Sequence, residues 1–205
     1  LGITAGAGML AKFNIGFMLP LIALALLGIS IRLRTLQPLI VGGLISGGLT
    51  IAIAAWWYIR NVTLYGDPTG LNVFLDIVGR RAIPANLAQI WAERGSFMAA
   101  FWGFFGGVNL PMPDAIYAVF DAIALIGIIG GVGWCIMHIS RVRLTSQTVQ
   151  HALPYAFTLL WIAINLVSYA RWTSETPASQ GRLMFGALSS IMLWLTIGLA
   201  AWLPR

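Results

Sequence analysis

Apolar segments of about 20 residues, five in all, constrain this chain more than any other feature. They lie at 13–31, 39–59, 115–137, 152–170 and 183–203. A helix of about 20 apolar residues crosses the hydrocarbon core of a bilayer, and inside lipid only helices and closed barrels satisfy every backbone polar group. The sequence therefore predicts an all-α, polytopic transmembrane helix bundle that forms a single integral membrane domain over 1–205.

The composition supports the same class. Hydrophobic residues make up 59% of the chain and charged residues 9%, whereas soluble domains carry about 25% charged residues. The net charge of +6 is not gathered in a basic run, so the predicted partners are membrane lipids and not nucleic acid. The single cysteine, Cys135, excludes an internal disulfide. The sequence predicts neither a metal site nor a cofactor.

Residues 1–11 precede the first span and are apolar and glycine-rich. Two interpretations stay open, the end of an earlier span or a short re-entrant segment. The chain starts at Leu1 without a methionine and shows no basic region of a signal peptide. We therefore expect it to be a piece of a longer protein.

The region 60–114 is the one long polar excursion. Trp56-Trp57-Tyr58 comes directly before it and is typical of an aromatic belt at the membrane interface. The run Tyr65-Gly66-Asp67-Pro68 has the residues of a tight turn.

Two amphipathic stretches follow within this region. The first, 71–78, repeats apolar residues at helical spacing, with Thr69 as the predicted N-cap and Gly79 as the predicted end. The second, 86–105, carries a broad apolar side. Its members are Leu87, Ile90, Trp91, Phe97, Met98 and Phe101. We expect both stretches to lie in the plane of the interface.

Glycines recur at four-residue spacing in two of the spans. Gly43-xxx-Gly47 lies in the second and Gly127-xxx-Gly131 in the third. Small residues at this spacing let another helix approach closely. We interpret both pairs as packing contacts.

The charged residues predict the orientation. One short loop carries Arg32 and Arg34, the other carries Arg141 and Arg143, and neither contains an acid. The positive-inside rule places such loops in the cytoplasm. The loop 60–114 is then extracytoplasmic and the C-terminus cytoplasmic. Lys12 is an exception, because five spans place it outside.

Four patches resemble the membrane portion of the GT-C superfamily, polytopic glycosyltransferases that use lipid-phosphate sugars, and its less characterised relatives. Trp-Trp-Tyr-Ile-Arg-Asn at 56–61, followed by Tyr-Gly-Asp-Pro, is the first. The others are Gly-Met-Leu-Ala-Lys-Phe-Asn at 8–14, Phe-Trp-Gly-Phe-Phe-Gly at 101–106 and Gln-Gly-Arg at 180–182. Together they touch most of the chain in the order of that family.

The resemblance implies an enzyme that moves a sugar from a polyprenyl phosphate onto an acceptor at the outer face. It also implies a substrate-binding set. Arg60 and Arg182 are the candidates for the donor phosphate, since arginine binds phosphate bidentately and is always charged. Asn61, Asp67 and Gln180 are the orienting or acceptor-side candidates.

The chain departs from the family in two ways. In relatives an aspartate of the first outer loop serves as base, and this loop is absent here, so no catalytic residue is assigned. Leu183 also stands where relatives often have an aromatic residue. Whether this chain alone is an enzyme therefore stays open.

Each singled-out residue also has a structural interpretation. Arg60 and Arg182 are equally typical of side chains that anchor helix ends, and Asp67 is typical of a turn. Asp121 is a carboxylate inside a span, which is costly and usually has a partner. His138 and His151 border a loop, where a solvated side chain is expected more than a haem ligand.

A second function stays open beside the glycosyltransferase. The chain has the features of a non-catalytic transmembrane subunit of a larger membrane complex, for example an energy-transducing one. Other membrane subunits are then its predicted partners. A transporter is a weaker third interpretation, because it normally shows charged or broken helices near mid-membrane, and here only Asp121 and Asn165 come close.

Overall fold

The structure is a computed structural model that describes residues 1–106, 109–141 and 145–204. Helices make up nearly all of its regular structure. Five of them are long and apolar enough to cross a membrane, namely Phe13–Leu33, Gln37–Tyr65, Asp114–His138, Gln150–Glu175 and Gly181–Ala200. Each overlaps a predicted span. The prediction of an all-α helical membrane protein with about five spans is confirmed.

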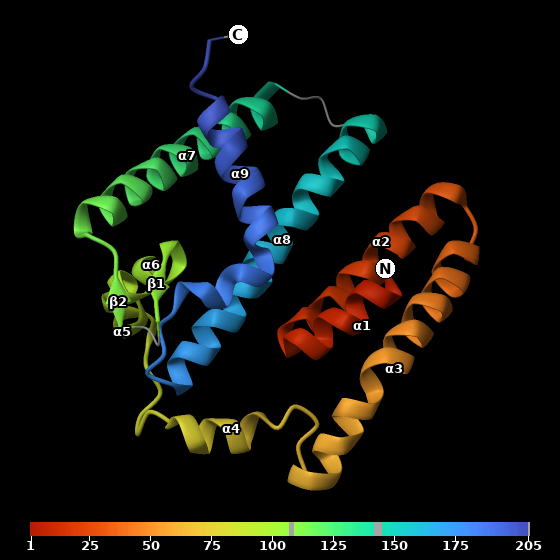
Figure 1. Ribbon diagram of the computed structural model, residues 1–205. Coiled ribbons are helices and arrows are strands. Elements are labelled where there is room, and N and C mark those ends of the chain that lie inside the picture. Colours follow the sequence, from red (N-terminus) through yellow and green to blue (C-terminus); the bar gives the residue numbers. More distant parts are fainter. Residues whose placement is uncertain (107–108, 142–144, 205) are drawn as a thin grey trace. The chain divides into compact units, whose positions relative to one another are not determined.

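The chain folds as two compact units, Leu1–Arg80 and Arg81–Arg205. Figure 1 shows the helices of both, coloured along the sequence. The single membrane domain over 1–205 stays a prediction.

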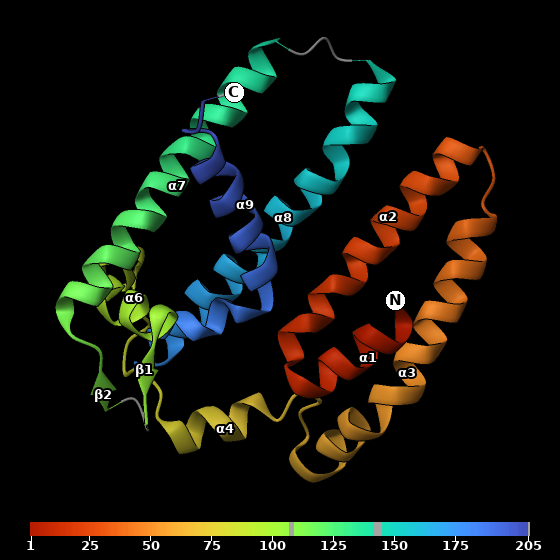
Figure 2. The same ribbon diagram turned by 45° about the horizontal axis from the view of Figure 1, so that its top comes forward.

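The first unit contains a pair of antiparallel helices with a shorter helix beside them. Its elements are α1 (Gly2–Ala11), η1 (Phe13–Phe17), α2 (Met18–Leu33), α3 (Gln37–Tyr65) and α4 (Leu71–Val78). Helix α1 packs along α3 (Figures 1 and 2). A side chain on Gly2 would collide with Ser46, and the Thr50 hydroxyl donates to the Gly2 carbonyl at 3.2 Å. Gly2–Ala11 thus form a helix that packs against α3. Both interpretations of residues 1–11, the end of an earlier span and a short re-entrant segment, stay predictions.

The second unit begins with short elements and continues with three long helices. Its elements are α5 (Leu87–Ala92), α6 (Arg94–Trp102), β1 (Phe104–Phe105), β2 (Leu110–Pro111), α7 (Asp114–Arg141), α8 (Ser146–Glu175), η2 (Gly181–Ala187) and α9 (Leu188–Ala200). Helix α9 contacts both α7 and α8, while η2 packs against α6 and α8 (Figure 2). The strands β1 and β2 form a short antiparallel pair that the sequence did not predict.

The two glycine pairs differ in the structure. A Cβ on Gly198 of α9 would collide with the backbone of Gly127 on α7, so these helices touch at backbone distance. The packing contact predicted for Gly127-xxx-Gly131 is confirmed. Within the described residues nothing lies within 4 Å of a Cβ built on Gly43 or Gly47. The packing contact predicted for this pair has no partner among the described residues, so it stays a prediction.

The structure corrects two details of the region 60–114. The predicted helix 71–78 is present and ends at Gly79, but its N-cap is Gly70 (φ 65°), not Thr69. The stretch 86–105 is divided at Glu93 into α5 and α6. The ring of Phe97 packs edge-on against Tyr169 at 4.9 Å. Part of the apolar side of 86–105, which was expected to lie at the membrane interface, therefore faces the interior of the second unit.

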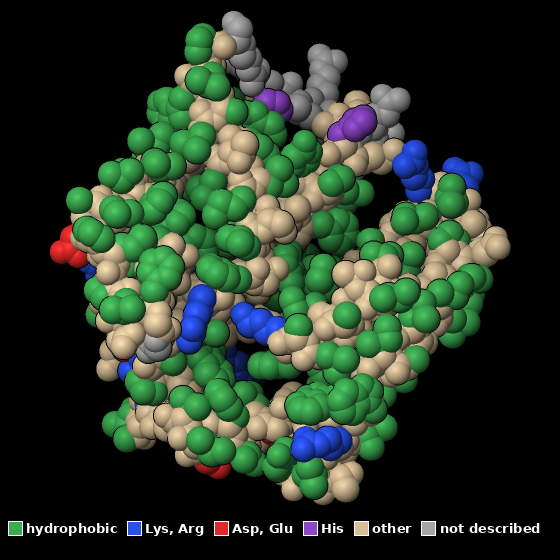
Figure 3. Space-filling view, in the orientation of Figure 1, with side chains coloured by type: hydrophobic (Ala, Val, Ile, Leu, Met, Phe, Trp, Pro, Cys, Tyr) green, Lys and Arg blue, Asp and Glu red, His purple; other side chains and the backbone are tan. Residues whose placement is uncertain are grey.

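The outer surfaces are apolar. Figure 3 shows hydrophobic side chains over most of the visible faces of the helices, and many large ones are exposed, among them Leu44, Ile51, Val119 and Ile136. A helix that is apolar on its exposed side is suited to contact with lipid. Both units are therefore suited to be embedded in a membrane.

Candidate functional site

In the first unit, Arg60 and Asn61 occupy the last turns of α3. Arg60 is exposed, and its guanidinium carbon lies 5.1 Å from the centre of the Trp57 ring. This is a cation–π contact, which an exposed arginine makes at little cost. Asn61 is only 2% exposed, and its Nδ2 donates to the Pro68 carbonyl at 3.2 Å. Arg60 is thus open to an anion, while Asn61 fastens the following turn to the helix.

Asp67 closes that turn and caps α4. Its carboxylate accepts hydrogen bonds from the backbone N–H of Thr69 at 3.0 Å and of Asn72 at 3.1 Å. The Thr69 hydroxyl and the Asn72 side chain donate to it as well. The Asn72 N–H first, and then Thr69, hold the pKa of Asp67 below its ordinary value. The carboxylate is thus occupied as a helix cap, and its role toward a substrate stays a prediction.

In the second unit, Gln180 and Arg182 flank the start of η2. Arg182 is exposed, and its Nε donates to Gln180 Oε1 at 2.6 Å. Gly181 between them is buried, and a Cβ there would lie 2.5 Å from the Cβ of Phe101. Only glycine fits this contact. The structure thus groups the predicted residues in two sets, Arg60, Asn61 and Asp67 in the first unit and Gln180 and Arg182 in the second.

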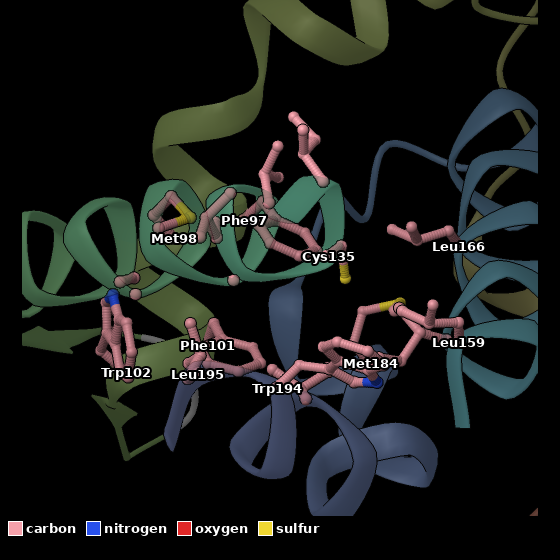
Figure 4. Close-up of a pocket in the computed structure, with 18 residues that line it drawn as sticks. Phe97, Met98, Phe101, Trp102, Cys135, Leu159, Leu166, Met184, Trp194 and Leu195 are labelled. Atoms are coloured by element: carbon pink, nitrogen blue, oxygen red, sulfur yellow. The ribbon is translucent and has the colours of Figure 1, made fainter. Parts of the chain in front are cut away.

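An apolar cavity lies within the second unit, with a volume of about 570 Å³. Figure 4 shows side chains from α6, α7, α8, η2 and α9 around it. Those labelled there are Phe97, Met98, Phe101, Trp102, Cys135, Leu159, Leu166, Met184, Trp194 and Leu195. The volume falls within the usual range of about 300–1,000 Å³ for small-molecule sites. The sequence did not predict this cavity.

The polar atoms at the cavity wall are already bonded. Trp102 Nε1 donates to Asp121 at 2.7 Å, and Trp194 Nε1 donates to the hydroxyl of Thr158 at 3.0 Å. Asp121 thereby has the partner that a carboxylate inside a span requires. What remains for a ligand is almost entirely hydrocarbon surface, which suits an alkyl or prenyl chain and no polar molecule.

Gln180 and Arg182 stand next to this cavity. Met184, on the first turn of η2, lines the cavity, and so does Phe101, against which Gly181 packs. A cationic and an amide side chain therefore lie close in the chain to residues that line the cavity. A ligand with a hydrocarbon chain and an anionic end matches this pair of surfaces.

An ion pair that sequence reasoning missed joins Arg81 of the loop to Glu93, the residue before α6. Arg81 Nη2 lies 2.6 and 2.8 Å from the two oxygens of Glu93. The Ser179 hydroxyl, 86 residues further along the chain, donates to Glu93. No local spacing signals such a contact, because its partners lie far apart in the sequence.

The histidines form no metal or haem site among the described residues. His138 stacks on Trp134 with ring centres 4.1 Å apart, and both His138 and His151 are exposed. Across the ranges described, no three His, Cys, Asp or Glu side chains are grouped so that they could hold a metal ion. Arg143 of the predicted basic loop lies outside the described residues, and the side chain of Arg141 does as well.

Comparison with known proteins adds no relative. No protein-family profile, no curated protein and no solved structure matches this chain.

Proposed function

We propose that this chain is the membrane portion of a glycosyltransferase that resembles the GT-C superfamily and takes its sugar from a polyprenyl phosphate. One observation supports the proposal most. The Gln180–Arg182 pair lies beside residues that line an apolar cavity, within a unit that contains membrane-length helices. A polyprenyl phosphate has the same division into a hydrocarbon chain and an anionic end.

On this proposal the apolar cavity and the Gln180–Arg182 pair recognise different parts of the lipid. Lipid surrounds the protein, so a prenyl chain gains little from leaving one apolar medium for another. The cavity then selects by shape, while the charged end distinguishes a phosphate lipid from a neutral one. The Arg182 guanidinium is suited to this, since it is exposed and oriented by Gln180.

The transfer requires a good leaving group. The bond between the sugar C1 and a phosphate oxygen breaks, and C1 forms a bond to an acceptor oxygen. The phosphate leaves with the electron pair, and the acceptor proton goes to a base that we assign to no residue of this chain. Arg182 stabilises the charge that develops on the phosphate. Arg60, exposed at the end of α3, is the second candidate for such a contact.

The reaction is proposed at the extracytoplasmic face. Arg81 of the loop 60–114 donates to the carbonyls of Thr173 and Thr176 at the end of α8. The part of the loop that begins at Arg81 and the polar turn 171–182 therefore share one end of the second unit. This supports placing both outside, with the short arginine loops and the C-terminus in the cytoplasm.

The test measures polyprenyl-phosphate binding and sugar transfer by the protein that contains this chain, purified in lipid nanodiscs. We expect Arg182→Ala and Arg60→Ala each to weaken phosphate-lipid binding about 30-fold, from loss of a charge-assisted contact of about 2 kcal/mol. Arg94→Ala is the matched control, because Arg94 is an exposed arginine at the start of α6 that contacts Trp91. Wild-type binding by both test variants would contradict the proposal.

One observation favours the second candidate, a non-catalytic subunit of a membrane complex. The row Gly43, Gly47 and Gly48 on α3 meets no neighbour within 4 Å among the described residues. Such a row is where another transmembrane helix packs closely. Native mass measured after mild detergent extraction distinguishes the two, since a stable heteromeric complex that loses its partner on Gly47→Leu supports the subunit.

A further inference from the structure

Arg81 is the centre of a network that ties three segments of the second unit together. Its Nε donates to the carbonyls of Thr173 at 3.0 Å and Thr176 at 3.1 Å, and its Nη2 donates to Glu93. Both threonines are fully buried. A cation at this place satisfies carbonyls that the end of a helix leaves unpaired. We call Arg81, Glu93, Ser179, Thr173 and Thr176 the Arg81 network.

The network reaches the segment that carries Arg182 through a single hydroxyl. Ser179, which is 5% exposed, donates to Glu93 Oε2. Glu93 is also the N-cap residue of α6, and its carbonyl accepts from the N–H of Phe97 at 3.3 Å. Glu93 is thereby fixed to α6 at its backbone and to Arg81 at its carboxylate.

Helix α6 also holds Gly181, the residue that follows Gln180. Gly181 packs directly on the backbone and side chain of Phe101 and on the carbonyl of Phe97. Ser179 and Gly181, the two neighbours of Gln180, are therefore both held by α6 and its cap. The backbone of 179–181 has little freedom, so the side chains of Gln180 and Arg182 leave it from a fixed position beside the residues that line the cavity.

The bonding of Arg81 argues against a direct part in ligand binding. Its Nε and Nη2 are engaged by two carbonyls and both oxygens of a carboxylate. Glu93 repels an anion, and its carboxylate already accepts from Arg81 and Ser179. The network is thus suited to hold the geometry of its neighbours and not to touch a phosphate.

From this arrangement we infer that Glu93 and Ser179 are positioning residues, which fix Gln180 and Arg182 to receive the anionic end of a lipid whose chain occupies the cavity. The inference rests on the proposed function, because it assigns the phosphate to Arg182. A long side chain such as arginine loses rotamer freedom on binding. A rigid backbone and the hydrogen bond from Gln180 reduce that loss before the ligand arrives.

The test separates the anionic end from the chain with two probes, geranylgeranyl phosphate and the neutral alcohol geranylgeraniol. Cys135 lines the cavity and is the single cysteine of the chain. Protection of Cys135 from maleimide therefore reports occupancy of the cavity by either probe, in the protein that contains this chain, with any cysteines elsewhere in it replaced.

We expect Ser179→Ala to weaken binding of the phosphate about fivefold to tenfold and to leave binding of the alcohol unchanged. Ser179→Thr keeps the hydroxyl and should retain most of the affinity. Glu93→Gln should reproduce the loss seen in Ser179→Ala. If Glu93→Gln does not fold, Ser179→Ala decides alone, since it removes one oxygen and leaves the Arg81–Glu93 pair in place.

Two results would overturn the inference, and they differ. If Arg182→Ala weakens phosphate binding while Ser179→Ala and Glu93→Gln bind both probes as the wild type does, the network is structural only and the proposed function stands. If Arg182→Ala itself binds the phosphate as the wild type does, the phosphate site is not at Arg182. The positioning role and that part of the proposed function then fail together.

Discussion

The hydrogen bonds at the polar ends of the two units differ in how far apart their partners lie in the sequence. In the first, Asp67 bonds to Thr69 and Asn72, and Asn61 bonds to Pro68, all within 7 residues along the chain. In the second, Arg81 reaches Thr173 and Thr176, which lie 92 and 95 residues away. Short-range bonds shape one turn and the start of one helix. Long-range bonds fix separate segments against each other.

This difference separates structural polar residues from candidate functional ones. A carboxylate such as Asp67, which accepts from the backbone N–H of Thr69 in its own turn and of Asn72 in α4, has its hydrogen-bonding capacity used locally. Arg182 has one bond to its neighbour Gln180 and is otherwise exposed beside the apolar cavity. The stronger case for ligand binding is therefore in the second unit, where distant segments meet.

The largest expected effect concerns helix contacts in the two units. Gly198→Ala places a Cβ against the backbone of Gly127, so α7 and α9 must separate, and we expect a loss of about 3 kcal/mol in stability. Gly47→Ala, the matched change on α3, meets open space and should be neutral or stabilising by about 0.5–1 kcal/mol. Unfolding by denaturing detergent measures both. Equal stability of the two variants would contradict the α7–α9 contact.

A smaller effect should follow removal of the cap in the first unit. Asp67→Ala removes the acceptor of the Thr69 and Asn72 N–H groups, and caps of this kind contribute about 1 kcal/mol. Amide hydrogen exchange should quicken in α4 and stay unchanged in α7 to α9. Thr69→Ala, the change at the residue predicted as cap, should cost less. Faster exchange throughout the second unit would contradict a local role for Asp67.

The spans were predictable from sequence because the rule behind them is local. Within lipid a backbone must satisfy itself in a helix, so a run such as 115–137 has one outcome wherever it packs. The glycine pairs show the limit of such rules. Gly43-xxx-Gly47 and Gly127-xxx-Gly131 have the same spacing, yet among the described residues only the second meets a neighbouring helix, because spacing does not say which face of the helix is covered.

The candidate site was predictable in part. Arg60 and Arg182 could be singled out, since an arginine that ends an apolar span is visible in the sequence. The contact of Asp67 with the first turn of α4 was missed, because Thr69 is also a good cap residue and the turn geometry decides which N–H group each side chain reaches. The cavity and the pairing of Ser179 with Glu93 depend on tertiary packing between segments that no local pattern connects.

The smallest expected effect is a pH dependence of stability, which one experiment can measure at the polar ends of both units. The Ser179 hydroxyl, followed by Arg81, holds the pKa of Glu93 below its ordinary value, as the Asn72 and Thr69 N–H groups do for Asp67. A carboxyl with a lowered pKa in the folded state stabilises it above its unfolded pKa, about 4, and loses that contribution as the pH falls through the folded value. Both groups are partly exposed, so each contribution should stay below about 1 kcal/mol.

Acidification from pH 7 to below about 4 should therefore weaken the hydrogen bonds at the polar ends of both units, but different lengths of chain should be affected. Protonation of Asp67 should speed hydrogen exchange in α4 alone, while protonation of Glu93 should speed it in the segment before α6 and also around Ser179, which is 86 residues away. In Glu93→Gln, hydrogen exchange around Ser179 should change with pH only as much as the intrinsic chemical rate does. Exchange in α4 should still quicken on acidification, because Asp67 is unchanged. If exchange around Ser179 follows acid in Glu93→Gln as it does in the wild type, the long-range bond is not what holds that segment, and the contrast between the two units disappears.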